Sequence, residues 1–216
     1  LGAVVDIIVR RRETGGLVNI QATNAPHMLF SEDNVVAKFN HNKSQWGLFY
    51  NLSARNFKKT YTDIDETYVL ENKTIHRVQE GLHDQNKHFT HNIDLSYNLT
   101  EQDKYVFNVV FRNSVYDAPC LNQSNKLYDA ADADNYIFSR LKNKQSSYTP
   151  SLDLYYQRTL PKNQMLTMSV TGTLMHTDNN RLYHEYTPQA EDLAMIETDV
   201  TGNKRSIIGE AIYDKR

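Results

Sequence analysis

The sequence predicts an all-β protein, built as an antiparallel up-and-down meander of about eight strands. Three observations predict this fold class. Apolar and polar residues alternate along most of the chain with the two-residue period of a strand. No stretch has the capped 3.6-residue period of a helix. Short turns and long polar connections follow one another in strict alternation, which is typical of a meander of paired strands.

The clearest element is a hairpin whose arms, residues 148–160 and 165–177, flank a short turn that begins with Pro161. Along the first arm, Leu152, Leu154 and Tyr156 share one face, opposite Asp153, Tyr155 and Gln157. Along the second arm, one face carries Leu166, Met168, Val170 and Leu174, and the other carries Thr167, Ser169, Thr171 and Thr173. Each arm therefore has one apolar face and one face of hydroxyls, amides and a carboxylate.

Six further stretches are predicted as strands from the same alternation. In chain order they are 17–25, 34–41, 46–58, 89–99, 105–115 and 206–213. The most regular is 89–99, where Ile93 and Leu95 alternate with Asn92 and Asp94. Together with the two hairpin arms, these stretches make up the predicted meander.

The connections between these strands differ in length. The short ones are 42–45, 100–104 and 161–164, the long ones are 56–88, 113–147 and 178–205, and 26–33 is intermediate. Consecutive connections of a meander lie at opposite ends of the sheet, so all the long ones are expected at one end. We expect their outer parts to continue as β-ribbons, since structureless loops of about 30 residues are uncommon. This asymmetry is typical of a transmembrane β-barrel of the outer membrane.

Composition narrows the class of protein without excluding a barrel. With 24 basic and 26 acidic residues, the net charge of -2 gives no reason to expect nucleic acid as a partner. No run approaches the roughly 18 apolar residues that a membrane-spanning helix requires. Barrel strands need apolar residues only at alternate positions. The 14 tyrosines are consistent with two locations. Tyrosine is frequent at the membrane–water boundary of barrels, and it is also frequent on the strands and loop surfaces of soluble proteins.

The alternation leaves a soluble protein open as the alternative. This would be a β-sandwich or an open β-meander that binds a ligand or a surface partner and has no transport role. A soluble sandwich buries its apolar faces between two sheets. A transmembrane barrel turns its apolar residues towards lipid and its polar residues towards the lumen. The two proteins differ in what covers the apolar face.

The sequence contains no motif that predicts catalysis. It lacks a glycine-rich phosphate loop, a Gly-x-Ser-x-Gly elbow and a His-Glu-x-x-His zinc motif. Cys120 is the single cysteine, so no disulfide can form within the chain. We therefore expect no enzyme activity and no cofactor, and we assign no catalytic, metal-binding or ligand-binding residue.

Three groups of residues in or next to the long connections have ligand-like chemistry. The first is the histidine cluster His83, His88 and His91 beside Asp84, which can hold a metal only if its loop folds back on itself. The second is the acidic set Asp129, Asp132 and Asp134, which lacks the glycine and closing glutamate of a calcium loop. Solvated loops without metals are expected at both places. The third comprises aromatic residues that could stack on a flat ligand or pack among the loops: Tyr61, Tyr68, Phe89, Tyr116, Tyr128, Tyr136 and Phe138.

The opening residues resemble a known family. Residues 2–9 read Gly-Ala-Val-Val-Asp-Ile-Ile-Val, which resembles the closing strand of the plug domain in TonB-dependent outer-membrane receptors, particularly the Bacteroidota type. Residues 13–16, Glu-Thr-Gly-Gly, and the strand 17–21, Leu-Val-Asn-Ile-Gln, resemble the start of the barrel in that family. The remainder of the chain agrees with the family in pattern.

The resemblance implies two parts and one function. Residues 1–14 would be the end of the plug domain and a linker, and residues 15–216 the N-terminal part of the barrel. A family barrel of about 22 strands encloses the plug, so the chain would cover roughly its first third, as an excerpt of a longer polypeptide. The implied function is import of a scarce solute, which is a siderophore, cobalamin, a glycan or a peptide, across the outer membrane of a Gram-negative bacterium.

The resemblance also implies partners. They are outer-membrane lipid, the imported solute and a TonB-type energy-transducing protein that would contact the region upstream of residue 1. A surface lipoprotein is a further candidate, and no nucleic acid is expected. The polar residues expected to line the barrel wall against the plug are Asn92, Asp94, Arg112, Asp153 and Gln157.

Overall fold

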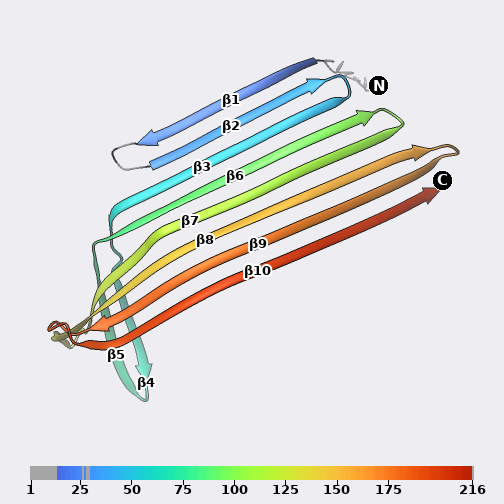
Figure 1. The fold of residues 1–216 in the computed structure, drawn as a ribbon. Helices are drawn as coiled ribbons and strands as arrows, with labels where there is room; N and C mark the ends of the chain where they lie inside the picture. The colour runs from blue at the N-terminus through green and yellow to red at the C-terminus, as the bar shows by residue number, and fades with distance from the viewer. Residues whose placement is uncertain (1–13, 26, 28–29, 216) are drawn as a thin grey trace, which may run out of the picture.

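The computed structural model describes residues 14–25, 27 and 30–215. Within them, ten antiparallel strands form one sheet (Figure 1). The strands are β1 (Thr14–Ala25), β2 (Phe30–His41), β3 (Ser44–Thr60), β4 (Ile64–Leu70), β5 (Lys73–Leu82), β6 (Asp84–Glu101), β7 (Tyr105–Asp129), β8 (Asp132–Leu160), β9 (Gln164–Tyr186) and β10 (Asp192–Lys215). The motif of residues 2–9 lies outside the described residues, so the end of a plug over 1–14 stays a prediction.

Eight strands form the main path of the sheet, in the order β1-β2-β3-β6-β7-β8-β9-β10. β4 and β5 form a hairpin beside this path, and β5 also pairs with β7 over residues Arg77 to Leu82. The predicted all-β antiparallel meander is confirmed, and the β4–β5 hairpin is an addition to it. The sheet is not closed, because β1 and β10 are its two edges.

Within residues 14–25, 27 and 30–215, no helix is both long enough and apolar enough to cross a membrane.

The strands extend beyond the stretches in which apolar residues alternate. β7, β8, β9 and β10 have 25, 29, 23 and 24 residues, whereas the alternation predicts about a dozen or fewer. Backbone pairing continues through the polar parts, where Tyr128 lies opposite Tyr136, and Phe138 opposite Tyr186. The prediction that the long connections continue as β-ribbons is therefore confirmed.

The two ends of the sheet differ in how far paired strands extend beyond the main path (Figure 1). One end, which we call the turn end, has short turns at residues 42–43, 102–104 and 161–163. The other, which we call the hairpin end, carries the β4–β5 hairpin and the ends of the β7–β8 and β9–β10 ribbons. Asn42, Asp103 and Asn163 have positive φ angles of 52°, 61° and 54°, a backbone conformation that Asn and Asp adopt more readily than most residues. The asymmetry expected from the sequence is present.

Strand register brings the apolar faces of the eight main strands onto one side of the sheet. Residues directly opposite each other in neighbouring antiparallel strands share a face. One such row consists of Val18, Ala37, Leu48, Leu95, Phe111, Leu152, Gly172 and Ile207. The next consists of Phe39, Trp46, Tyr97, Val109, Leu154 and Val170. We call this side the apolar face. The opposite side is the polar face, with a row of Gln21, Asn34, Asn51, Asn92, Ser114 and Thr149.

No second layer covers the apolar face within the described residues. Leu95, Trp46 and Ile207 leave 43%, 56% and 83% of their surface exposed. Among the described residues, Ala118 and Leu127 are the only buried hydrophobic residues. Burial of apolar surface is ordinarily the dominant favourable contribution to folding. Here that contribution depends on whatever surrounds the sheet, because the described chain does not supply it.

A carboxylate joins two of the short turns. Glu101 accepts hydrogen bonds from Lys104 Nζ at 2.7 Å and from Lys43 Nζ at 2.9 Å. These contacts lower the pKa of Glu101 from 4.5 to about 2, with Lys104 as the larger cause. A carboxyl group whose pKa is depressed in the folded state stabilises that state above its unfolded pKa, and the contribution is lost as pH falls through the folded value.

We expect the Glu101 carboxyl to titrate at a pH of about 2 in the folded protein, and its contribution to stability to disappear between pH 4.5 and about 2. The carboxyl carbon chemical shift, followed by NMR against pH, measures the titration. Replacing both partners, Lys43→Met with Lys104→Met, should move the midpoint back towards 4.5. A midpoint already at 4.5 in the unaltered protein would contradict these contacts.

Candidate functional site on the polar face

A ladder of side-chain hydrogen bonds crosses four strands of the polar face. Asn51 Nδ2 donates to Asn34 Oδ1 at 2.8 Å, and Asn92 Nδ2 donates to Asn51 Oδ1 at 3.4 Å. Ser114 Oγ donates to Asn92 Oδ1 at 2.8 Å. The ladder therefore ties β2, β3, β6 and β7 together on the side of the sheet where apolar packing is absent.

A second polar cluster crosses β7, β8 and β9. Arg112 forms an ion pair with Asp153, and Thr171 Oγ1 donates to the other carboxylate oxygen of Asp153 at 2.8 Å. Asp94 lies opposite Arg112 in the register of β6 and β7. The five residues expected to line a barrel wall all lie on the polar face: Asn92, Asp94, Arg112, Asp153 and Gln157. That this face borders a lumen stays a prediction.

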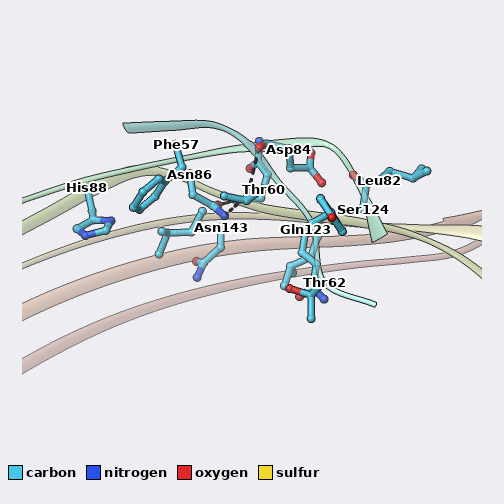
Figure 2. A pocket seen from close by; sticks show the side chains of 14 residues that line it. Phe57, Thr60, Thr62, Leu82, Asp84, Asn86, His88, Gln123, Ser124 and Asn143 are labelled. Carbon is cyan, nitrogen blue, oxygen red and sulfur yellow. Dashed lines mark hydrogen bonds between the residues drawn. The ribbon is translucent and has the colours of Figure 1, made fainter. Parts of the chain in front are cut away.

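A pocket of about 430 Å³ lies at the hairpin end of the polar face, at the root of the β4–β5 hairpin (Figure 2). One register row runs through it, in which Phe57, Asn86, Leu121 and Asn143 come from β3, β6, β7 and β8. His88, two residues after Asn86 in β6, also lines the pocket. Four strands of the sheet therefore contribute side chains to this one hollow.

A β-bulge in β7 decides which residues of that strand face the pocket. The register against β8 shifts between Ala118 and Leu121, and a matching shift occurs against β6. Pro119 lies in the bulge, where its lack of an N–H group costs no regular ladder hydrogen bond. Beyond the bulge, odd-numbered residues such as Leu121 lie on the polar face, which even-numbered residues such as Ser114 occupy before it.

The root of the hairpin is held by close backbone contacts. Thr60 Oγ1 donates to the backbone oxygen of Asp84 at 3.1 Å, and the N–H of Gly81 donates to Asp63 Oδ1 at 2.8 Å. A Cβ atom at Gly81 would lie 2.5 Å from the backbone nitrogen of Thr62. A side chain at position 81 would therefore displace the backbone of Thr62.

Three buried polar atoms at the pocket have no hydrogen-bond partner within the described protein. They are Asp84 Oδ2, His88 Nδ1 and Asn143 Oδ1. Asp84 is only 8% exposed. An unsatisfied buried polar group costs on the order of 1–3 kcal/mol. Such atoms therefore mark a place where another molecule can supply the missing partners.

Asn86, by contrast, is fully engaged within the protein. Its Nδ2 donates to Thr60 Oγ1 at 2.7 Å, as Figure 2 shows. Its Oδ1 accepts the backbone N–H of Asn122 at 2.8 Å. Asn86 therefore fixes the position of the hairpin root relative to β7, whereas the three unpaired atoms around it find no partner within the described protein.

Aromatic residues predicted as stacking candidates do not converge on one site. Tyr61 lines the pocket and stacks on His83, with ring centroids 5.4 Å apart and planes 11° apart. Tyr116 lies beside the pocket residue His88, with centroids 6.1 Å apart. The other candidates do not line the pocket: Tyr68, Phe89, Tyr128, Tyr136 and Phe138.

Two of these other candidates gather around one lysine at the hairpin end. Lys126 Nζ lies 4.8 Å from the ring centroid of Tyr128 and 4.4 Å from that of Tyr136. Tyr128 Oη donates to Glu80 Oε1 at 2.7 Å, and this hydrogen bond raises the pKa of Tyr128. The cluster ties β5 to β7 and β8, so packing within the ribbons accounts for these rings.

Residues considered as metal ligands are not brought together. His88 and His91 lie on opposite faces of β6, and the ring Nδ1 of His91 lies 2.8 Å from Tyr50 Oη on the apolar side. In the acidic set, Asp129 Oδ1 accepts the N–H of Ala131 at 2.9 Å within the β7–β8 turn. Over residues 14–25, 27 and 30–215, no group of three or more His, Cys, Asp or Glu side chains is placed to hold a metal.

Sequence reasoning did not single out the amides that line this pocket. Asn86 and Asn143 have no local pattern that marks them, and Asp84 drew notice only as a neighbour of histidines. Two residues nevertheless mark the place. Gly81 and Pro119 lie in the long connections, where glycine in a strand signals a close backbone approach and proline signals a bulge.

We expect Gly81→Ala to push the Thr62 backbone away and loosen the hairpin root, at a cost on the order of 1–3 kcal/mol. Limited proteolysis between β3 and β6 and urea unfolding both report the change. Gly172→Ala is the matched control, because nothing lies within 4 Å of a Cβ atom at Gly172. If the two variants were cleaved at the same rate, the close approach at Gly81 would be refuted.

Comparison with known proteins does not assign a family to the chain. No family model matches it, and neither a curated protein nor a solved structure matches it significantly. The resemblance of residues 2–9 to a plug domain therefore stays an expectation from the sequence.

Proposed function

We propose that the chain is part of a TonB-dependent transmembrane β-barrel that imports a scarce solute across the outer membrane of a Gram-negative bacterium. The observation that carries the proposal is the two-faced sheet. Its apolar face exposes large side chains, and its polar face carries side chains hydrogen-bonded to one another. A barrel turns the first face to lipid and the second to the lumen. A soluble sandwich covers its apolar face with a second sheet.

The extent of the apolar face along each strand supports the proposal. On β8 this face runs from Tyr148 to Tyr156, and on β9 from Leu166 to Leu174. Each run is about nine residues, close to the 9–11 that a tilted barrel strand uses to cross a bilayer. At about 3.3 Å per residue, this corresponds to roughly 30 Å of strand. An apolar core of a soluble sheet has no reason to match that thickness.

Aromatic rings border this apolar band at both ends. Towards the turn end, the ring centroids of Trp46 and Tyr97 lie 4.3 Å apart. Towards the hairpin end, Tyr148 stacks on His176 with centroids 5.1 Å apart. Rings with a polar edge favour the membrane–water boundary, and barrels carry girdles of them there.

Long ribbons at the hairpin end support a role outside the membrane. Strands of 23 to 29 residues extend over about 75–95 Å, whereas the hydrocarbon core of a bilayer is about 30 Å thick. The excess lies at the end that carries the β4–β5 hairpin. Under this proposal the ribbons stand in the external medium and hold the pocket there, where a solute can be captured.

The proposal also requires partners for the two edges of the sheet. Unpaired backbone groups in hydrocarbon cost several kcal/mol each, so β1 and β10 would have to pair with further strands of a larger barrel. The polar face would then line the lumen against a plug. A TonB-type protein would supply the energy for import, and the barrel itself would carry out no covalent chemistry.

Membrane extraction of the intact protein tests the proposal. We expect the protein to stay in the membrane pellet after washing with alkaline carbonate and to dissolve only with detergent, because the apolar band would face lipid. The measurement is the fraction of protein in the pellet. Recovery from periplasm or medium without detergent would overturn the barrel and favour the soluble binding module.

Single arginines test the assignment of the two faces. Leu95→Arg and Leu154→Arg should each destabilise the protein by roughly 2–4 kcal/mol in a bilayer, since both lie near the middle of the apolar band. Asp94→Arg, on the opposite face of the same strand, should cost much less, although Arg112 lies opposite it. Urea unfolding in lipid measures the difference. Similar losses at positions 94 and 95 would contradict the assigned faces.

A further inference from the structure

We propose that the apolar face holds one phospholipid with an anionic headgroup near the turn end of β1, β2, β3 and β6, which are neighbours in the sheet (Figure 1). The inference rests on the proposed function, because this face meets lipid only if the sheet lies in a membrane. It goes beyond general contact with lipid, since it assigns one acyl chain and one phosphate to named places on the sheet.

A groove of about 380 Å³ in the apolar face provides the place for the acyl chain. Its floor lies where two neighbouring strands carry small residues, Gly16 in β1 and Ala37 in β2. Larger side chains of the apolar face stand around it: Val18, Phe39, Trp46, Leu48 and Leu95. Three more residues line the groove from positions whose side chains alternate to the polar face: Leu17, Lys38 and Gly47. An acyl chain can fill this groove through dispersion contacts.

The groove by itself does not choose between lipids. Lipid chains are all similarly apolar, so inside a bilayer a chain gains contacts in the groove but no hydrophobic free energy. A preference for one lipid therefore has to come from its headgroup, at the border of the apolar band. The groove holds the lipid at one place along that border.

A polar hollow continues the groove at the turn end. It is lined by His41, Asn42, Lys43 and Ser44. In β2, His41 follows the groove residue Phe39 by two positions, which is about 7 Å along the strand and on the same face. In β3, Ser44 precedes the groove residue Trp46 by the same interval. A lipid whose chain lies in the groove therefore has its headgroup at this hollow.

Aromatic rings join the groove to the hollow. The rings of Trp46 and Tyr97 have centroids 4.3 Å apart, and Tyr97 Oη lies 3.2 Å from Ser44 Oγ. Either hydroxyl can be the donor, so the pair keeps one hydroxyl proton for a phosphate or ester oxygen. Rings with a polar edge favour the membrane–water boundary, which places the hollow at the level of the lipid headgroups.

The charge of the hollow favours an anionic headgroup. Its lining contains one lysine, Lys43, and no carboxylate. Lys43 and Lys104 both donate to Glu101, so two ammonium groups share one carboxylate. The side chain of Lys43 is 53% exposed, and its ammonium group has three N–H donors. The ammonium group can therefore bind a phosphate oxygen while it keeps its contact with Glu101.

The lining residue His41 is not assigned to the phosphate. Its two ring nitrogens lie 3.3 Å from Thr14 Oγ1 and 3.2 Å from Asn42 Nδ2. Both nitrogens therefore have a neighbour within the protein, and the phosphate contact is assigned to Lys43.

Fluorescence quenching by lipids with brominated chains tests the site at Trp46. The intact protein is reconstituted in phosphatidylcholine with rising fractions of brominated phosphatidylglycerol or brominated phosphatidylethanolamine. The signal of Trp46 is the difference between the protein and Trp46→Phe, so that only this ring is measured. We expect phosphatidylglycerol to take the place beside Trp46 about fivefold more readily than phosphatidylcholine, which is the effect of one lysine at a charged headgroup. Phosphatidylethanolamine should show no preference.

Variants locate the headgroup and the chain. Lys43→Met should remove most of the preference, whereas Lys162→Met, in the turn between β8 and β9, should leave it unchanged. Ala37→Leu should fill the groove and also remove the preference. Ala211→Leu is its matched control, because it adds the same volume to the apolar face of β10, outside the groove. High salt should reduce the preference of the unaltered protein, since the charges are exposed.

Several results would overturn the inference. They are equal association of phosphatidylglycerol and phosphatidylcholine, equal losses in Lys43→Met and Lys162→Met, or equal losses in Ala37→Leu and Ala211→Leu. Absence of quenching at Trp46 by every brominated lipid would also overturn it, and extraction then separates two causes. A protein that needs detergent has the groove covered by protein, such as a second copy, which refutes the lipid site alone. A protein recovered without detergent refutes the barrel, and the lipid site with it.

Discussion

Strand register is the constraint on which the rest of this structure depends. Side chains change face at every residue, so a slip of one residue in one strand pair would carry its apolar residues to the other side of the sheet. Leu95 lies opposite Phe111, and Phe111 lies opposite Leu152. This register keeps the apolar residues of β6, β7 and β8 on the same side of the sheet. The amide ladder that joins Asn34 to Ser114 can form only because the same register keeps leucines off its face.

The two faces divide the stabilising interactions between the chain and its surroundings. On the polar face, side chains find their partners on neighbouring strands, as Arg112 and Thr171 do at Asp153. On the apolar face, Leu95 and Trp46 remain about half exposed. The stabilising free energy of removing these side chains from water is gained only if lipid or a second protein layer covers them. Under the proposed function a lipid bilayer covers the apolar face. The stability of the folded sheet then depends on the membrane as well as on the protein.

Irregular backbone builds the candidate site on this regular scaffold. The bulge at Pro119 and the close approach at Gly81 both lie at the hairpin end, where β3 and β6 give way to the β4–β5 hairpin. Unpaired buried atoms occur there at Asp84, His88 and Asn143, whereas the ladder residues Asn51 and Asn92 are satisfied. Binding groups commonly lie on irregular segments held by a rigid scaffold.

The sequence by itself determined the all-β class, the order of the eight main strands, the faces of each strand and the end at which the long connections lie. These follow from a local signal, the two-residue alternation of residues such as Ile93 and Leu95 with Asn92 and Asp94. Only the tertiary structure decided the full lengths of β7 to β10, the pairing of β5 with β7, and the meeting of Asp84, His88 and Asn143 at one pocket. Polar residues on both faces of a ribbon leave no periodic signal. The site also depends on a one-residue shift in β7 and on backbone contact between Gly81 and Thr62, which arise only when distant segments pair.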